Sequence, residues 1–163
     1  MAEAKTNAQR QLEREKISYL PHTYETADGL LDGVSVAEKC GMAVETVFKT
    51  LVTRGASGGI YVFAVPVAQE LDLKAAARAA GEKSIEMVAV KEITPLTGYL
   101  KGGCSPIGMK KRYPTVIDDS ALSLRTMVVS AGRIGAQVEL APDGLRQATG
   151  CSFAPIAHRS DQG

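Results

Sequence analysis

Two runs of β-branched and aromatic residues in the first half of the chain predict a β-hairpin. Residues 47–53 and 60–67 are rich in Val, Phe, Leu and Ile, and three glycines lie in the polar segment 54–59 between them. Runs of this kind that flank a short glycine-containing segment are typical of two antiparallel strands joined by a turn. The pattern therefore predicts strands at 47–53 and 60–67.

Helices are predicted where a capping residue comes before, and a glycine after, a short run of helix-forming residues. Asp72 precedes the alanine-rich segment 73–80, which ends at Gly81, and Pro142 begins a helix at 143–149 that ends at Gly150. Further helices are expected at 8–16 and 35–40 with a helical turn at 92–97, and further strands at 17–24, 87–90, 115–117, 125–130 and 136–140. Because the helices are interspersed among strands without regular β-α-β alternation, we predict an α+β fold with a mixed sheet.

Composition sets limits on the class of protein. With 163 residues, 45% of them apolar and 23% charged, the chain is expected to fold as one domain over residues 1–163, with an N-terminal helix within about 1–16. Aromatic residues are 5% of the chain and Trp is absent, which argues against a platform that stacks long single-stranded nucleic acids. Neither a signal peptide nor a membrane span is recognisable, so a cytoplasmic location and no membrane partner are expected. Three cysteines without C-x-x-C spacing indicate neither a disulfide framework nor a zinc site, and we expect no metal and no cofactor.

The segment 98–114 combines a glycine-rich loop with a cluster of cations. Glycines let a backbone approach a ligand closely or adopt positive φ, and cations without a neighbouring acid favour an anionic partner. Since the net charge of the whole chain is only +1, such a partner would be met at one place. A solvated turn before a strand explains the composition equally well. The residues concerned are Gly102, Gly103 and Gly108 with Lys101, Lys110, Lys111 and Arg112.

Lys49 occupies an unusual position inside the predicted strand 47–53. Strand alternation places it on the same face as Val47 and Leu51, and Thr50 on the opposite face. An ammonium among apolar residues must find a partner, extend to an edge, or serve a ligand, because its burial alone is costly. Lys49 is therefore either an edge residue or a fixed cation at the mouth of a pocket, suited to a phosphate, a carboxylate or a developing oxyanion.

Several blocks in one order make the chain resemble the YbaK/EbsC family. They are Phe48–Val52, Ala64–Val67 with Gln69–Lys74, Gly98–Gly108 and Val129–Arg133, and the match runs from about residue 19 to residue 156. The resemblance implies the editing-domain fold associated with prolyl-tRNA synthetase, a mixed, barrel-like sheet with flanking helices. It also implies an editing deacylase that removes cysteine from Cys-tRNA(Pro), and in some settings from Cys-tRNA(Cys), and that binds the aminoacyl-tRNA acceptor end, with prolyl-tRNA synthetase as a further candidate partner.

The implied chemistry needs no nucleophile from the protein, because the thiol of the substrate attacks its own ester. Two alternatives remain open: a deacylase that uses water on other small aminoacyl groups such as alanine and serine, and a non-catalytic tRNA-binding or regulatory module. A regulator that reads a DNA groove is disfavoured, since the predicted helices at 35–40 and 73–80 lack clustered cations. Cys104 is interpreted as a small hydrophobic residue rather than a nucleophile, and His22 as structural or as a pocket wall.

The resemblance assigns the site residue by residue. Lys49 and Gly102 correspond to the catalytic positions. If tRNA is the ligand, the cation cluster itself, Lys101, Lys110, Lys111 and Arg112, is expected to contact nucleic acid. The substrate-binding positions are Tyr24, Thr50, Gly103, Ser105, Ser130 and Gln137. Two departures affect the expected specificity: Leu31 or Asp32 stands where close members carry an aromatic residue, and Gln137 stands where well-studied members carry an aspartate.

Overall fold

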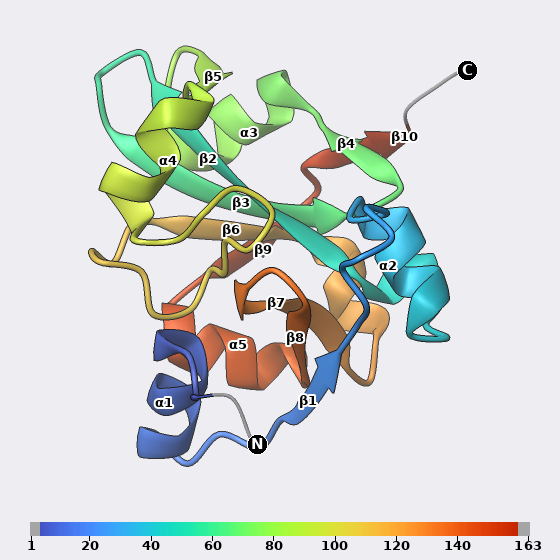
Figure 1. Ribbon diagram of the computed structural model, residues 1–163. Helices are drawn as coiled ribbons and strands as arrows, with labels where there is room; N and C mark the ends of the chain where they lie inside the picture. The colour runs from blue at the N-terminus through green and yellow to red at the C-terminus, as the bar shows by residue number, and fades with distance from the viewer. Residues whose placement is uncertain (1–3, 160–163) are drawn as a thin grey trace.

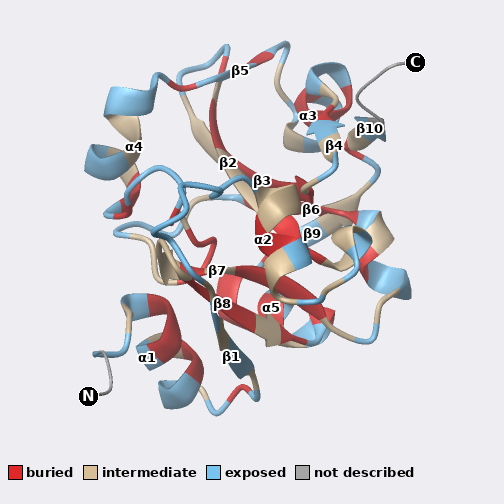
Figure 2. Ribbon diagram, turned by 45° about the vertical axis from the view of Figure 1, so that its right-hand side comes forward, coloured by how far each residue is buried: buried red, intermediate tan, exposed pale blue. Residues whose placement is uncertain are grey.

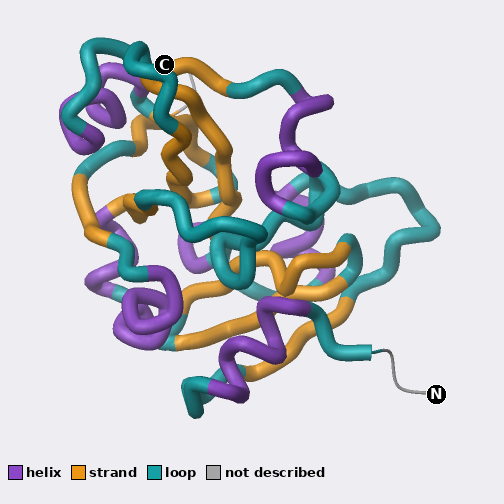
Figure 3. Tube along the Cα trace, turned by 90° about the vertical axis from the view of Figure 1, so that its left-hand side faces the viewer, coloured by secondary structure: helices purple, strands orange, loops and turns teal. Residues whose placement is uncertain are grey.

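The computed structural model describes residues 4–159, in which helices flank three β-sheets (Figures 1 and 3). In chain order the helices are α1 (Asn7–Arg14), α2 (Gly33–Lys39), α3 (Leu73–Ala80), α4 (Val90–Thr97) and α5 (Pro142–Thr149), with 3-10 turns η1 (Val44–Thr46) and η2 (Asp119–Ser123). The strands are β1 (Leu20–Thr23), β2 (Phe48–Gly55), β3 (Ile60–Pro66), β4 (Gln69–Leu71), β5 (Ile85–Met87), β6 (Thr115–Asp118), β7 (Met127–Arg133), β8 (Ala136–Leu140), β9 (Ser152–Ala154) and β10 (Ala157–Arg159).

The largest sheet is mixed, which confirms the predicted α+β class. Its order is β5-β2-β3-β6-β9; β2 pairs with β3 and β5 antiparallel, whereas β3-β6 and β6-β9 are parallel. A second sheet, β1-β8-β7, and a two-stranded ribbon, β10-β4, are assigned separately, and an isolated parallel bridge joins Val47, just before β2, to Val128 of β7. The strands of the described chain thus form three sheets and do not close into one continuous barrel.

Elements with strong local signals were predicted correctly. The hairpin β2–β3 is antiparallel, with Phe48 opposite Pro66 at one end. The side chain of Asp72 accepts hydrogen bonds from the backbone N–H groups of Lys74 and Ala75, and Gly81 ends α3 with φ +73°. Such a cap stabilises a helix by about 1 kcal/mol. The strand predicted at 17–24 is shorter, and the three-residue strands β4, β9 and β10 were not predicted.

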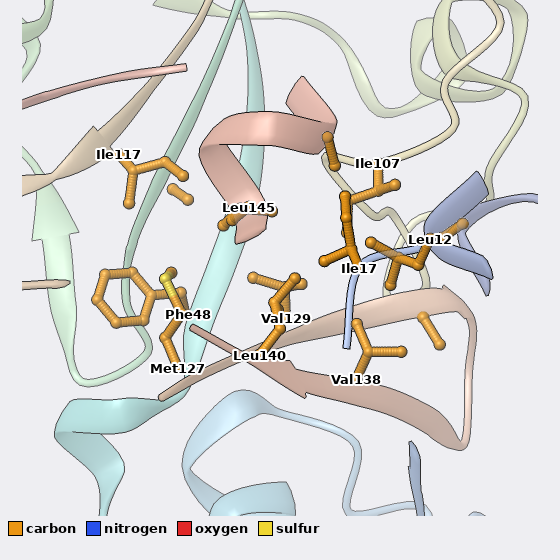
Figure 4. Close-up of a cluster of buried hydrophobic side chains, with 14 of the residues drawn as sticks. Leu12, Ile17, Phe48, Ile107, Ile117, Met127, Val129, Val138, Leu140 and Leu145 are labelled. Atoms are coloured by element: carbon orange, nitrogen blue, oxygen red, sulfur yellow. The ribbon is translucent and has the colours of Figure 1, made fainter. Parts of the chain in front are cut away.

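The large sheet separates two hydrophobic clusters, and strand alternation explains why. Phe48, Ala64 and Ile117 face the lower cluster, which joins the sheet to α1, α5, β7 and β8 (Figure 4). Phe63 and Val65 face the opposite way, toward the cluster beneath α3. Figure 2 shows buried positions concentrated along these central strands, while the outer turns of the helices are exposed.

The lower cluster holds α1 against the remainder of the chain. Ala8 and Leu12 of α1 are fully buried beside Ile107, which belongs to the glycine-rich segment (Figure 4). The hydroxyl of Tyr99 donates to the C=O of Ile107 at 2.7 Å, which ties the start of that segment to its middle. The packing of Ile107 against α1 therefore anchors the glycine-rich segment to the core. No helix within residues 4–159 is long and apolar enough to span a bilayer.

Candidate active site

One cavity of about 320 Å³ lies where β2, the glycine-rich loop and α2 meet. This volume is within the range of small-molecule sites. Its walls come from parts of the chain that are far apart in sequence, so it exists only in the folded protein. The residues that line it are Tyr24, Leu31, Gly33, Val36, Val47–Val52, Val67, Met87, Val88, Ile93, Lys101, Gly102, Cys104, Ser130 and Gln137.

The wall made by β2 includes a short stretch of open sheet edge, between the isolated bridge that joins Val47 to Val128 and the strand β5. The N–H of Val67 donates to the C=O of Val47, so odd-numbered residues of β2 direct their backbone polar groups toward β3 and even-numbered residues direct theirs away. The C=O of Val52 accordingly accepts from the N–H of Val88, on the side opposite β3. Strand β5 pairs only with the far end of β2, at 53–55. The backbone N–H and C=O of Thr50 therefore lie on an edge that β5 leaves open.

Thr50 also carries a polar group without a partner. Its Oγ1 is buried and, among the residues that the structure describes, is one of two buried side-chain oxygen or nitrogen atoms that make no hydrogen bond. Such a group raises the free energy of the folded state by about 1–3 kcal/mol. An orphaned hydroxyl and an open backbone edge at the same pocket residue are features that a polar ligand would satisfy.

Lys49 reaches the cavity from the other face of β2. It lies opposite Val65, and its Nζ is 3.7 Å from Oε2 of Glu70 in β4. The side chain of Lys49 is 31% exposed and that of Glu70 is 56% exposed, so this is a rim ion pair and not a buried one. A pair of this kind contributes little to stability, about 0–1 kcal/mol. Lys49 is thus an accessible cation beside a mostly apolar cavity.

The glycine-rich loop forms the wall opposite β2. Gly102 lines the cavity with φ +89°, a conformation that favours glycine, while a side chain there would meet only the flexible Ile134 at 3.7 Å. A Cβ on Gly103 would come within 2.8 Å of the backbone N of Ile134. Gly103 therefore allows close packing against β7, and it does not line the cavity. Gly102 thus forms part of the cavity wall, whereas Gly103 permits close packing of the loop.

Three further predicted residues reach the cavity with some of their polar groups already used. Ser130 Oγ accepts from the N–H of Gly132 at 3.1 Å. The side chain of Gln137 is buried, and its Oε1 is 3.8 Å from the Sγ of Cys40. Tyr24 lies at the cavity with its ring 5.8 Å from Nζ of Lys39. These residues supply neutral hydrogen-bonding groups to the lining.

Ser105 and two of the expected nucleic-acid residues are engaged elsewhere. Ser105 is fully buried, outside the cavity lining, and its Oγ accepts from the N–H of Ile107 at 3.2 Å. Arg112 donates through Nε to the C=O of Thr149 at 3.1 Å, at the C-terminus of α5, where a cation is electrostatically favourable. Lys110 Nζ donates to the C=O of Pro95 at 3.2 Å.

Lys101 and Lys111 lie at different hollows of the surface. Lys101 lines the main cavity, whereas Lys111 lines a separate hollow of about 80 Å³ together with Arg112. Of the four cations in the basic segment, Lys101 alone lines the main cavity.

The cavity cysteine is poorly suited to nucleophilic attack. Burial raises the pKa of the Cys104 thiol to about 11, so it carries almost no thiolate at neutral pH. Burial also raises the pKa of Cys40. His22 is engaged with Glu139 at 2.8 Å, on the β1–β8 sheet. Within residues 4–159, no three His, Cys, Asp or Glu side chains gather in a group that would hold a metal ion.

Sequence reasoning missed part of the apolar lining and the partner of Lys49. Val36, Val67, Met87 and Ile93 line the cavity but were not singled out, because apolar residues carry no sign of which cavity they face. Glu70 lies within the block that resembles the family, yet its proximity to Lys49 depends on how β4 follows β3.

Comparison with known proteins agrees with this architecture. The aminoacyl-tRNA editing domain model matches residues 32–148. The chain is 44% identical over 152 residues, 93% of each chain, to a protein of Enterococcus faecalis described as "Putative Cys-tRNA(Pro)/Cys-tRNA(Cys) deacylase EbsC". The chain belongs to the aminoacyl-tRNA editing domain family. The predicted resemblance to the YbaK/EbsC family is confirmed.

Two solved structures share the fold of the chain. A crystal structure described as a "putative trans-editing enzyme for prolyl tRNA synthetase" matches with a TM-score of 0.81 and 24% identity, over 96% of this chain and 99% of that chain. A crystal structure of a hypothetical protein matches with a TM-score of 0.85 and 22% identity, over 94% of this chain and all of that chain. At these identities the matches concern the fold alone.

Proposed function

We propose that the protein is a trans-editing aminoacyl-tRNA deacylase that removes cysteine from mischarged Cys-tRNA(Pro), with Cys-tRNA(Cys) as a further substrate. The observation that carries the proposal is a cavity of about 320 Å³ that is lined both by an accessible cation, Lys49, and by the positive-φ glycine Gly102. Membership of the editing-domain family and 44% identity to the Enterococcus protein support it.

The walls of the cavity suit a small amino-acid side chain attached to a polar ester. Val36, Val47 and Val67 supply apolar surface, while Thr50 and Ser130 supply hydroxyl groups. Cysteine and proline have similar bulk, and a synthetase pocket discriminates weakly between groups that differ by about one methylene. A second site that contacts the amino acid differently can hydrolyse the wrong ester after the synthetase has made it.

The reaction follows from the substrate's own thiol. Its sulfur attacks the ester carbonyl, an S–C bond forms, the bond to the tRNA 3′-oxygen breaks, and the thiol proton ends on that oxygen. Water then opens the resulting thiolactone to free cysteine. In this scheme Lys49 stabilises the negative charge that develops on the carbonyl oxygen, and the Gly102 backbone positions the ester. A thiol that belongs to the substrate removes the need for Cys104 as a nucleophile.

The tRNA acceptor end would approach from the side of Lys101. This cation lines the cavity, so it is placed to meet a terminal phosphate. Each phosphate contact made by a cation contributes roughly 0.7 to 0.9 to the slope of log affinity against log salt concentration. Binding that depends on Lys101 should therefore weaken with salt, and a bound prolyl-tRNA synthetase could supply further tRNA contacts. The proposed site of action is the cytoplasm, where aminoacyl-tRNA is made.

A panel of esters tests the substrate. Cys-tRNA(Pro), Cys-tRNA(Cys), Ala-tRNA(Pro) and Ser-tRNA(Pro) are incubated with excess enzyme, and release of the labelled amino acid is followed through one turnover. We expect rapid release of cysteine and slow release of alanine and serine. Equal release of all three would mean that water attacks and the thiol is dispensable. Release of none, with tRNA still bound, would favour a binding module.

A further inference from the structure

The cavity contains two cations and lacks a carboxylate of its own. Among the described residues that line it, the charged side chains are Lys49 and Lys101. An aminoacyl ester carries an α-ammonium group next to the carbonyl that reacts. An ammonium beside two cations is electrostatically unfavourable unless an anion lies close by. The cavity lining therefore leaves this part of an aminoacyl ligand without a counter-charge.

Glu70 is the carboxylate placed to supply it. It is the acidic group paired with the cavity cation Lys49, at an Oε2–Nζ distance of 3.7 Å. Other acids on nearby elements are held more tightly by cations outside the cavity lining: Asp28 lies 2.7 Å from Lys39, and Glu92 lies 2.8 Å from Arg54. Of these three acids, Glu70 has the longest ion pair, and it is the one paired with a cavity cation.

The geometry of the Lys49–Glu70 pair leaves room for a ligand. A direct charge-assisted hydrogen bond is about 2.7–2.9 Å long, so 3.7 Å is an electrostatic contact that does not saturate the carboxylate. An ionised carboxylate has about four acceptor positions. Glu70 is 56% exposed, and its backbone is held in the β4–β10 ribbon opposite His158 (Figure 1). It can accept an N–H from a ligand while it remains beside Lys49.

Strand β4, which carries Glu70, follows an apolar wall of the cavity closely in the chain. Val67 lines the cavity and β4 begins at Gln69, so Glu70 follows the apolar wall almost directly. In an aminoacyl group the α-ammonium nitrogen is two bonds from the β-carbon, so a ligand whose side chain contacts Val67 would carry its ammonium close to that wall. Lys49 and Glu70 together offer a positive and a negative charge to a ligand that has a partly negative ester and a positive ammonium.

We propose that Glu70 is a specificity-determining residue that binds the α-ammonium group of the aminoacyl ester, next to the Lys49 that faces the ester itself. The inference rests on the proposed function, since it assumes an aminoacyl ligand in this cavity. It predicts that the enzyme distinguishes amino acids from otherwise identical acids without the amino group. Gln137, which is uncharged, then takes no part in ammonium charge recognition.

The test compares two esters that differ only in the amino group. Cys-tRNA(Pro) and 3-mercaptopropionyl-tRNA(Pro) have the same ester and the same thiol, and the second lacks the ammonium. Half-saturation concentrations are measured under single-turnover conditions for the wild type, for Glu70→Gln and for a matched control, Glu45→Gln. Glu45 is an exposed carboxylate in η1, just before β2, so its substitution changes net charge equally.

We expect Glu70→Gln to raise the half-saturation concentration for Cys-tRNA(Pro) about tenfold and that for the mercaptopropionyl ester less than about twofold. Glu45→Gln should change neither. An equal increase for both esters would overturn the inference and assign Glu70 to holding Lys49. Faster turnover of both would identify Glu70 as a competing counter-ion, and no change would also refute the inference.

Failure of the proposed function would be visible separately. If the wild type cleaves neither ester, deacylation is refuted and binding decides the inference about Glu70. The probes are then the non-hydrolysable 3′-amide analogues of the same two tRNAs. Weaker binding of the cysteinyl amide alone to Glu70→Gln supports an ammonium contact, and equal binding of both amides to the variant and the wild type contradicts it.

Discussion

Replacing Thr50 with valine should stabilise the free protein and impair its activity. The two side chains have nearly the same shape, and the substitution removes a buried hydroxyl that has no hydrogen-bond partner among the described residues. Relief of such a group is worth about 1 kcal/mol or more. For a chain of 163 residues, 1 kcal/mol corresponds to a rise in Tm of about 2–4 °C.

The same strand offers a matched control. Thr53 is fully buried, and its Oγ1 donates to the C=O of Tyr61 at 2.8 Å. Thr53→Val therefore removes a hydrogen bond that is made, which costs about 0.5–1.5 kcal/mol. Two identical substitutions three positions apart on β2 should shift stability in opposite directions. Stability gained at the expense of activity is expected where a residue is kept for function.

The assay combines urea unfolding with single-turnover deacylation of Cys-tRNA(Pro). We expect Thr50→Val to have a higher unfolding midpoint and slower deacylation, and Thr53→Val to have a lower midpoint with deacylation close to that of the wild type at temperatures where it is folded. If Thr50→Val is destabilised as much as Thr53→Val, the Thr50 hydroxyl has a partner and the reasoning is wrong. Unchanged deacylation by Thr50→Val would exclude the hydroxyl from ligand binding.

Three further predictions concern the loop, the thiol and acid stability. Gly102→Ala and Gly58→Ala both place alanine at positive φ, +89° and +95°, so thermal unfolding should show a loss of about 1–2 kcal/mol of stability for each. Only the cavity variant, Gly102→Ala, should also lose deacylation activity. Cys104→Ala should retain deacylation activity within about threefold of the wild type. In the wild type, burial raises the pKa of the Cys104 thiol to about 11, so a fraction of about 10⁻⁴ should be ionised at pH 7 and the thiol should react slowly with iodoacetamide. The hydrogen bond from Thr126, and then the contact with His22, hold the pKa of Glu139 below its ordinary value. The contribution of Glu139 to stability is therefore present above about pH 4.3 and is lost as pH falls through the lowered pKa. Urea titrations at several pH values should show a smaller acid loss of stability for Glu139→Gln than for the wild type, and an unchanged acid profile would contradict this prediction.

Local signals explain which parts of the fold could be predicted. Asp72 and Gly81 define α3 by capping chemistry that acts within a few residues, and the glycine-containing segment 54–59 defines the β2–β3 hairpin in the same way. Strands β4 and β10 could not be predicted because each has three residues and is defined by its distant partner; Gln69 lies opposite Arg159. Parallel pairing of β6 with β3 likewise depends on the assembled sheet.

The candidate site shows the same division. Lys49 could be recognised from sequence because an ammonium inside an apolar strand demands a reason, and the structure brings it to a cavity. Arg112 belonged to a conspicuous basic run, but its guanidinium is used at the C-terminus of α5, a partner that no local pattern reveals. Glu70 was not singled out because only its distance to Lys49 in the folded chain marks it as a candidate site residue.

The most direct test of the account is single-turnover deacylation of Cys-tRNA(Pro) by Lys49→Ala beside the wild type. Lys49 is partly exposed and its ion pair is loose, so the variant should fold with an unchanged circular dichroism spectrum and a Tm close to that of the wild type. If Lys49 stabilises the developing oxyanion, deacylation should fall by about 100-fold or more while tRNA binding changes little. Deacylation at the wild-type rate by the folded variant would contradict the account and remove this cavity as the site of catalysis.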